Sequence, residues 1–294
     1  MLGAHQAILQ RDPDPQFFES AIRTMERETL LHDLTTAYAQ IVGSIWRSEE
    51  AARRRRFPSK APRLVPFMPE ATLAPLHGAK IYAFGCEPWV AWLLAASGLN
   101  PSTSPLGPMQ FPLPALLPCL REDFARVLVP YGYERNPDFH DEAAPKLVEY
   151  VHEALQRETG DLVSMIGEGP IEVVLQRQRW RFDRLLDDLN ADAPLFLVQM
   201  FRGFPDDEAV FRELAAHLAK AAPRARLVGV ALLDDPPSGP FPEPEIALQT
   251  DNALLFSYRS LSAPAARGFS DPLDDLVIMR VVAQALADAQ AAAA

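Results

Sequence analysis

A cysteine at the end of a predicted strand is the residue in this sequence best suited to chemistry. The apolar run Ile81–Phe84 ends at Gly85, Cys86 follows it, and Glu87 and Pro88 lead into a helical pattern. Proline suits the first turn of a helix because its missing N–H is not needed there. The positive end of that helix favours the thiolate of Cys86, which is the nucleophilic form. Cys86 is therefore a candidate nucleophile; the alternative is a small buried hydrophobic residue, because free cysteines are often buried.

A cysteine nucleophile needs a general base, and His140 is the histidine that fits this role best. It lies in a polar loop, Asn136–Asp141, before a predicted helix. His152 and His217 fall on predicted helices instead, and we interpret them as structural. Loops held by a rigid scaffold carry catalytic groups more often than helix faces do. Cys86 and His140 together would support hydrolysis or acyl transfer.

A glycine-rich turn offers a second contribution to the same site. Gly167-Glu168-Gly169-Pro170 follows a predicted strand and precedes a predicted helix, so it could line a site at the same sheet edge. The turn lacks the third glycine of a dinucleotide-binding motif, and no other cofactor motif is present, so no cofactor is expected. The sequence also lacks zinc-type spacing, so no metal is expected.

Composition narrows the classes of function. The chain has 294 residues and a net charge of −11, which argues against nucleic-acid binding because that function needs a basic face. The two cysteines, Cys86 and Cys119, are too few for a disulfide scaffold. They fit a reducing compartment, so we expect a cytoplasmic location. No apolar run reaches the roughly 18 residues of a membrane span.

The elements that must position these residues change in character along the chain. Residues 1–57 show helical periodicity alone, and residues 58–78 are rich in proline without a clear period, which is typical of a linker. Over residues 79–294, apolar runs alternate with amphipathic helices, which predicts an α/β domain with a mainly parallel sheet covered by helices on both faces. The predicted strands are Lys80–Phe84, Leu162–Ile166, Leu195–Phe201, Leu227–Leu233 and Ala253–Tyr258. The predicted helices are Trp89–Ser97, Leu113–Val129, Ala144–Glu158, Glu172–Asn190, Asp206–Ala222 and Leu273–Ala291.

The sequence supports two further predictions, one about strand pairing and one about a basic helix. No helix separates Leu227–Leu233 from Ala253–Tyr258, which predicts one antiparallel pairing at the sheet edge. The helix Glu172–Asn190 has a basic side, which is explained either by ion pairs with acidic neighbours on the same helix or by an anionic ligand. That side consists of Arg177, Arg179, Arg181 and Arg184.

The N-terminal segment contains an unusual turn sequence. Ile8-Leu9-Gln10-Arg11-Asp12-Pro13-Asp14-Pro15 precedes a helix, and Ser48-Glu49-Glu50 closes the segment. These residues resemble a bacterial helical domain that is found beside glycosyltransferases, with Gln10 in place of the usual glycine. The resemblance implies that residues 1–57 are an interaction module for a protein partner, not an enzyme.

Short sequence blocks follow Cys86 in a definite order. They are Gly98-Leu99, Ser104-Pro105, Glu122-Asp123-Phe124, Tyr131-Gly132, His140-Asp141, Arg179-Trp180-Arg181-Phe182 and the strand Leu195–Val198. Their order and spacing resemble a bacterial family of papain-like cysteine peptidases whose members often accompany surface-polysaccharide genes. We expect Phe124 and Phe182 to be buried in such a fold. Cys119, in an apolar surround, should have a raised pKa.

The resemblance implies a cysteine-dependent hydrolase or acyl transferase with Cys86 as nucleophile and His140 as base, acting on a small-molecule, peptide or glycan substrate. The family's Phe-Asp-Trp triplet is replaced here by Leu106-Gly107-Pro108. The alternative function is therefore a catalytically inactive scaffold that recruits a glycosyltransferase or a surface-assembly partner. The candidate substrate-binding residues are Gly85, Glu87, Ser104, Gly167 and Glu168.

Overall fold

The structure is a computed structural model that describes a large part of the chain from Glu70 onward. The described residues are 70–86, 89–97, 99, 102–107, 109–139, 146–203, 207–233, 244–262, 264–265, 268–269 and 272–293. The predicted interaction module of residues 1–57 and the first part of the predicted linker lie outside these residues, as do Glu87 and His140.

A five-stranded sheet forms the centre of the fold, with the strand order β1-β6-β7-β9-β8. The first four strands in this order are parallel, and β8 pairs antiparallel with β9 at the edge. Every residue of β6 from Leu195 to Phe201 is buried, as expected for a parallel strand covered on both faces. The predicted α/β class with a mainly parallel sheet is confirmed. The strands are β1 (Lys80–Cys86), β6 (Leu195–Arg202), β7 (Ala225–Leu233), β8 (Glu245–Gln249) and β9 (Ala253–Arg259).

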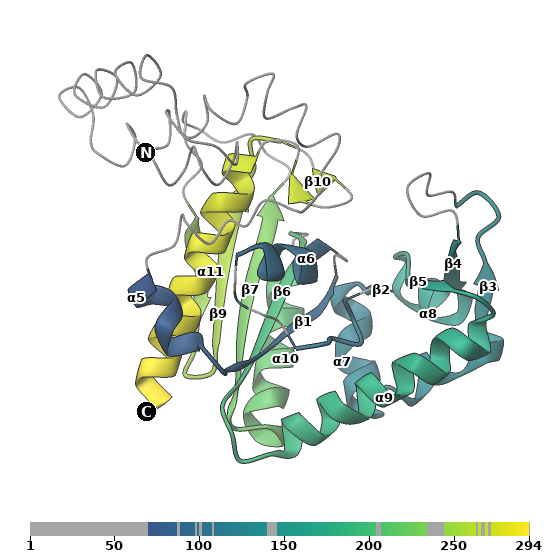
Figure 1. The fold of residues 1–294 in the computed structure, drawn as a ribbon, viewed down its shortest axis with the longest axis horizontal. Helices are drawn as coiled ribbons and strands as arrows, with labels where there is room; N and C mark the ends of the chain where they lie inside the picture. Colours follow the sequence, from purple (N-terminus) through teal and green to yellow (C-terminus); the bar gives the residue numbers. More distant parts are fainter. Residues whose placement is uncertain are drawn as a thin grey trace.

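Helices cover both faces of this sheet (Figure 1). One apolar cluster joins α6 (Trp89–Ala96) and α11 (Pro272–Ala293) to alternate residues of β6, including Phe196 and Val198. The intervening residues of β6 face a second cluster, because successive side chains of a strand point to opposite faces. The helices of that second cluster are α7 (Leu113–Arg121), α9 (Ile171–Asn190) and α10 (Asp207–Ala221).

The start of the described chain packs along α11. Short helices α5 (Glu70–Leu73) and η2 (Ala74–Leu76) occupy the second half of the predicted linker. Leu73 and Leu76 are buried in the same apolar cluster as α11. A small hairpin, β10 (Pro264–Ala265) with β11 (Gly268–Phe269), lies between β9 and α11 in the chain.

The structure contains a second, antiparallel sheet that was not predicted, and two predictions are wrong because of it. Its strand order is β2-β5-β4-β3, so the predicted strand Leu162–Ile166, observed as β5, does not join the parallel sheet. The predicted helix Ala144–Glu158 is wrong over its middle part, where β4 forms, because valine and tyrosine in that stretch favour a pleated strand. The elements are β2 (Met109–Gln110), β3 (Tyr133–Arg135), β4 (Leu147–His152), β5 (Ser164–Glu168) and α8 (Glu153–Thr159).

Two other boundaries differ from prediction. The predicted helix Leu113–Val129 stops at Arg121, because Asp123 and Phe124 have φ angles of 50° and 59° that a helix cannot contain. The turns η3 (Ala125–Leu128) and η4 (Pro130–Gly132) follow. The expected antiparallel edge pairing exists, but it joins β8 to β9, and β9 itself runs parallel to β7.

A buried carboxylate ties α9 to the first strand. Lys80 Nζ and Tyr82 Oη both donate hydrogen bonds to Asp188, the latter at 2.7 Å. Burial alone raises the pKa of Asp188, but the hydrogen bonds from Lys80 and Tyr82 outweigh it and hold the pKa below its ordinary value. The charged form of Asp188 therefore stabilises the folded chain.

We expect Asp188→Asn to lower the free energy of unfolding by about 1–2 kcal/mol at pH 7. A carboxylate with a depressed folded pKa stabilises the fold above its unfolded pKa of about 3.9, and this contribution disappears as the pH falls through the folded pKa. Urea unfolding of both proteins between pH 7 and pH 2 should show the difference shrinking below about pH 4. Asp192→Asn, in an exposed ion pair with Arg224, is the control. A difference that stays constant to pH 2 would contradict the role of the charge.

Candidate functional site

The carboxyl ends of the parallel strands β1, β6, β7 and β9 lie at one edge of the sheet. The chain leaves β1 into α6, which packs on one face of the sheet. It leaves β6 into α10, which packs on the other face. Open α/β sheets bind ligands beside the carboxyl ends of their strands. Cys86 is the last residue of β1 and pairs with Met200 of β6, so it lies at this edge.

The strand is irregular just before Cys86. The pairing with β6 shifts register between Ala83 and Cys86, which is a bulge that redirects the following residues. Gly85 has a φ of +96°, a conformation that residues with a side chain rarely adopt. A Cβ at Gly85 would also lie 3.4 Å from the carbonyl oxygen of Phe111. Gly85 therefore lets β1 turn toward α6 while a neighbouring backbone passes closely.

Ser104 holds a loop against the free edge of β1. Its hydroxyl donates to the carbonyl oxygen of Ala83 and accepts a hydrogen bond of 3.2 Å from the Leu106 N–H. The Ser102 N–H donates to the carbonyl oxygen of Ile81 at 2.6 Å, so the loop follows the strand. Ser104 is buried, and it bonds to Ala83, three residues before Cys86. Its role is therefore to position the loop beside the end of β1.

Gly167 and Glu168 are not brought to Cys86. Both lie at the end of β5 in the antiparallel sheet, where Glu168 is exposed and pairs with Leu147. That sheet approaches β1 through β2, which pairs with the opposite end of β5 at Ser164, roughly 13 Å from Glu168 along the strand. A Cβ at Gly167 would lie 2.7 Å from the side chain of Val174. Gly167 thus serves the packing of β5 against α9.

The second cysteine, Cys119, is not accessible to a substrate at the surface. Cys119 is a free thiol on α7 with no exposed surface. Burial raises its pKa to about 12, so the thiolate is scarce at neutral pH. The predicted rise in the pKa of Cys119 is confirmed.

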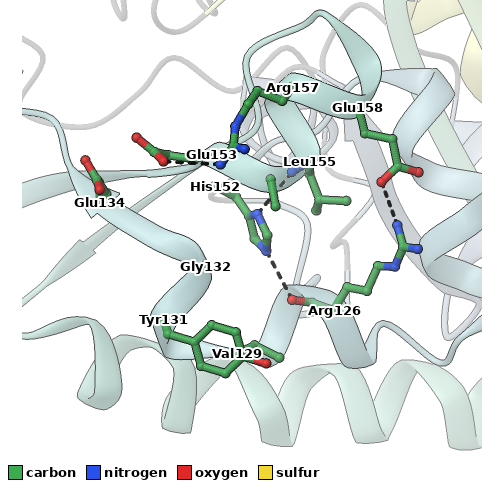
Figure 2. Close-up of a pocket in the computed structure, with 11 residues that line it drawn as sticks. Arg126, Val129, Tyr131, Gly132, Glu134, His152, Glu153, Leu155, Arg157 and Glu158 are labelled. Atoms are coloured by element: carbon green, nitrogen blue, oxygen red, sulfur yellow. Dashed lines mark hydrogen bonds and ion pairs between the residues drawn. The ribbon is translucent and has the colours of Figure 1, made fainter.

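His152 is structural, although it lies at the end of β4 and not on a helix. Its Nδ1 accepts a hydrogen bond of 3.3 Å from the Leu155 N–H, which caps α8. Its Nε2 donates to the carbonyl oxygen of Arg126 at 3.1 Å, so the neutral ring carries its proton on Nε2. Figure 2 shows the ring held between these two partners in the wall of a cavity of about 360 Å³. Both nitrogens are occupied, which leaves no free base at this position.

Two charged residues that the sequence analysis missed lie at the same edge of the parallel sheet. Arg202 is exposed at the end of β6, two residues beyond Met200 and so roughly 7 Å further along the strand. Asp274, in the first turn of α11, is buried and accepts hydrogen bonds from the Tyr258 hydroxyl, the Leu261 N–H and Ser262. A charged residue at the carboxyl end of a strand that is apolar apart from Gln199 is the signal that would have identified Arg202.

Comparison with known proteins does not assign a function to this chain. The chain matches no protein-family model, and no curated protein or solved structure gives a significant match. Within the described ranges, no group of three or more His, Cys, Asp or Glu side chains could hold a metal ion. Among the helices that the structure describes, none combines the length and apolar character needed to cross a membrane. What the fold defines is an open, mainly parallel α/β sheet beside a separate antiparallel sheet, with a cysteine at the carboxyl end of its edge strand β1.

Proposed function

We propose that this chain is a cysteine-dependent hydrolase or acyl transferase with Cys86 as its nucleophile. The observation that supports it is the position of Cys86 at the carboxyl end of β1, the edge at which open α/β sheets bind ligands. Only Glu87 and Pro88 separate Cys86 from α6, so the N-terminal N–H groups of that helix favour the thiolate. The resemblance to papain-like cysteine peptidases supports the same chemistry and suggests a substrate from surface-polysaccharide assembly.

The proposed reaction proceeds in two acyl-transfer steps. His140 takes the thiol proton, and Cys86 Sγ attacks the carbonyl carbon of an ester, thioester or amide to form a tetrahedral intermediate. Collapse of the intermediate breaks the bond to the leaving group, which takes the proton from His140. Water, or a hydroxyl of an acceptor, then attacks the acyl-cysteine and restores the thiol. N–H groups at the start of α6 are suited to stabilise the oxyanion, and Arg202 is suited to bind a negatively charged part of the substrate.

Alkylation by iodoacetamide tests the nucleophile. In the folded protein we expect Cys86 to react more than tenfold faster than Cys119, because the thiolate fraction of Cys119 at pH 8 is on the order of 10⁻⁴ for a pKa of about 12. Peptide mass mapping over time gives both rates. His140→Ala should shift the pH profile of Cys86 labelling toward that of an ordinary thiol. Faster labelling of Cys119 would show that the assignment of Cys86 is wrong, and an unchanged profile in His140→Ala would remove His140 as the base.

A simple ester tests the chemistry itself. With p-nitrophenyl acetate, wild type should release a burst of one equivalent of nitrophenolate as the acyl-cysteine forms, and Cys86→Ser should not. Cys119→Ser is the matched control and should keep the burst. Loss of the burst in the control, or its persistence in Cys86→Ser, would contradict the proposal.

The inactive scaffold remains the second candidate because of one observation. At the position of the family's Phe-Asp-Trp triplet, Leu106 is buried in the core and its N–H bonds to the Ser104 hydroxyl. Gly107 lies where a Cβ would be 3.3 Å from Ala91. This stretch therefore serves packing. A folded protein that gives no burst and no preferential labelling of Cys86 would favour the scaffold, in which residues 1–57 recruit the partner.

A further inference from the structure

The outer face of α9 exposes hydrophobic surface that a monomer does not need. Four large hydrophobic side chains are exposed among the described residues, and three of them belong to α9 or to η4, which contacts it. Trp180 is 59% exposed, Val173 is 38% exposed, and Tyr131 of η4 is 93% exposed. Figure 1 shows α9 along the rim of the molecule, with no other described element on its outer side.

The arginines of α9 are not paired with the acids of the same helix, in contrast to the first explanation from sequence. Arg177, Arg179, Arg181 and Arg184 form no salt bridge with the described residues, and Asp188 is held by Lys80 and Tyr82. Arg184 attracts Asp188 only through space, and Arg181 donates a long hydrogen bond of 3.5 Å to Gln178. Arg184 lies over the ring of Trp180, with its guanidinium carbon 5.7 Å from the ring centre. Among the exposed arginines outside α9, Arg121, Arg126, Arg212 and Arg224 each contact a carboxylate. Arg135, Arg202 and Arg280 are exposed without a salt bridge to the described residues, but no exposed tryptophan accompanies them.

The spacing of these side chains makes one continuous surface. Val173, Arg177, Trp180 and Arg184 follow each other at intervals of three or four residues, so they line one side of the helix. We call this set the α9 face. Val173 to Arg184 spans about 17 Å along the helix, which is room for three turns of a partner helix.

We infer that the α9 face is a docking surface for an acidic segment of another protein. Tryptophan, tyrosine and arginine are the residue types that dominate the binding energy of protein interfaces. Between Arg177 and Arg184 the helix carries four arginines and a single carboxylate, Asp183, so carboxylates on the partner complement it. Guanidinium groups beside an exposed indole can pair with carboxylates while the ring packs on apolar groups between them.

The same surface does not fit a nucleic acid. Asp183 and Asp187 are exposed on the α9 helix, next to the arginines. A phosphate backbone presents one sign of charge along its whole length, and the chain as a whole has a net charge of −11. A protein segment can place acids opposite Arg177 and Arg184 and a neutral or basic residue opposite Asp187. The mixed signs therefore favour a protein partner.

The test measures binding of a defined acidic probe to the full chain. The probe is a fluorescein-labelled peptide with leucine and glutamate at helical spacing, followed by fluorescence anisotropy at 50 mM and 300 mM NaCl. We expect saturable binding that weakens with salt. Trp180→Ala and the double variant Arg177→Glu/Arg184→Glu should each lose about tenfold in affinity or more. Arg212→Glu/Arg224→Glu changes the net charge equally at arginines away from α9 and should lose much less.

Three results would overturn the inference. The first is the absence of saturable binding at a 100-fold molar excess of protein, and the second is an equal loss of affinity in the Arg212→Glu/Arg224→Glu control. The third is equal binding of the same peptide with lysine in place of glutamate. If a 20-nucleotide oligothymidine bound more tightly than the peptide, and did so through Trp180, the partner would be a nucleic acid and not an acidic protein. If the chain self-associated through Trp180 in sedimentation, the partner would be a second copy of this chain. Cys86 labelling in Trp180→Ala should match wild type, so failure of this inference and failure of the proposed chemistry are distinguishable.

Discussion

Replacing Phe182 by alanine is expected to lower the free energy of unfolding by about 3–5 kcal/mol. The ring has no exposed surface and lies 4.7 Å, centre to centre, from the ring of Phe124. Phe182 comes from the inner face of α9, and Phe124 from the turn after α7, so the pair joins two segments of the core. Their predicted burial is confirmed. Truncation removes apolar contact and leaves a cavity that the rigid surroundings fill only in part.

Urea unfolding followed by circular dichroism measures this effect. Val173→Ala, on the exposed side of the same helix, is the matched control and should change the free energy of unfolding by about 0.5 kcal/mol or less. Because the two rings touch, Phe124→Ala combined with Phe182→Ala should cost less than the sum of the single changes. A loss below about 1 kcal/mol for Phe182→Ala would show that the ring contributes little to the core.

Replacing Asp274 by alanine should cost about 3 kcal/mol of stability. The buried carboxylate accepts hydrogen bonds from the Tyr258 hydroxyl at 2.7 Å, the Leu261 N–H at 2.8 Å and the Ser262 N–H at 3.0 Å. Each donor loses this acceptor in Asp274→Ala, and a buried donor without its bond costs about 1–3 kcal/mol. These bonds fasten the end of β9 to the start of α11, at the carboxyl edge of the parallel sheet.

The control for Asp274 lies on the same helix. Asp288 accepts one exposed hydrogen bond from Gln284, so Asp288→Ala should remain within about 0.5 kcal/mol of wild type. Thermal and urea unfolding of both variants give the comparison. Equal stabilities of Asp274→Ala and Asp288→Ala would mean that the buried carboxylate is no more important than a surface acid.

The antiparallel sheet escaped prediction for a physical reason. Three of the six residues of β4 are buried, but two of them, Glu149 and His152, are polar. In β3 one residue of three is buried, so neither strand forms a continuous apolar run. The stretch around Val148, Tyr150 and Leu155 has apolar residues at spacings that suit a helix or a strand. Pairing with β5 decides in favour of a strand for the first part, and the His152 cap starts α8 immediately after it.

Part of the candidate site could also be predicted from the sequence, and part could not. Local sequence was enough to place Cys86 at a strand end before a helix, because the glycine, the proline and the apolar run lie within a few residues of one another. It was not enough to tell whether Glu168 joins Cys86, because that depends on which sheet β5 enters. The hydrogen bonds that order the two sheets link residues far apart in the chain.

Local patterns along the chain were sufficient to predict the parallel strands and the helices that cover them, since burial on both faces requires continuous apolar runs that are visible locally. They were also sufficient to predict that Cys119 is inert, because its apolar neighbours are adjacent in the chain. Which charges pair depends instead on how the elements pack. Helical spacing placed Asp188 near Arg184, yet packing of α9 on β1 brings Lys80 and Tyr82 to that carboxylate, in a buried position where a hydrogen bond is worth more than on the surface. Arg177, Arg179 and Arg184 are left exposed to solvent as a result.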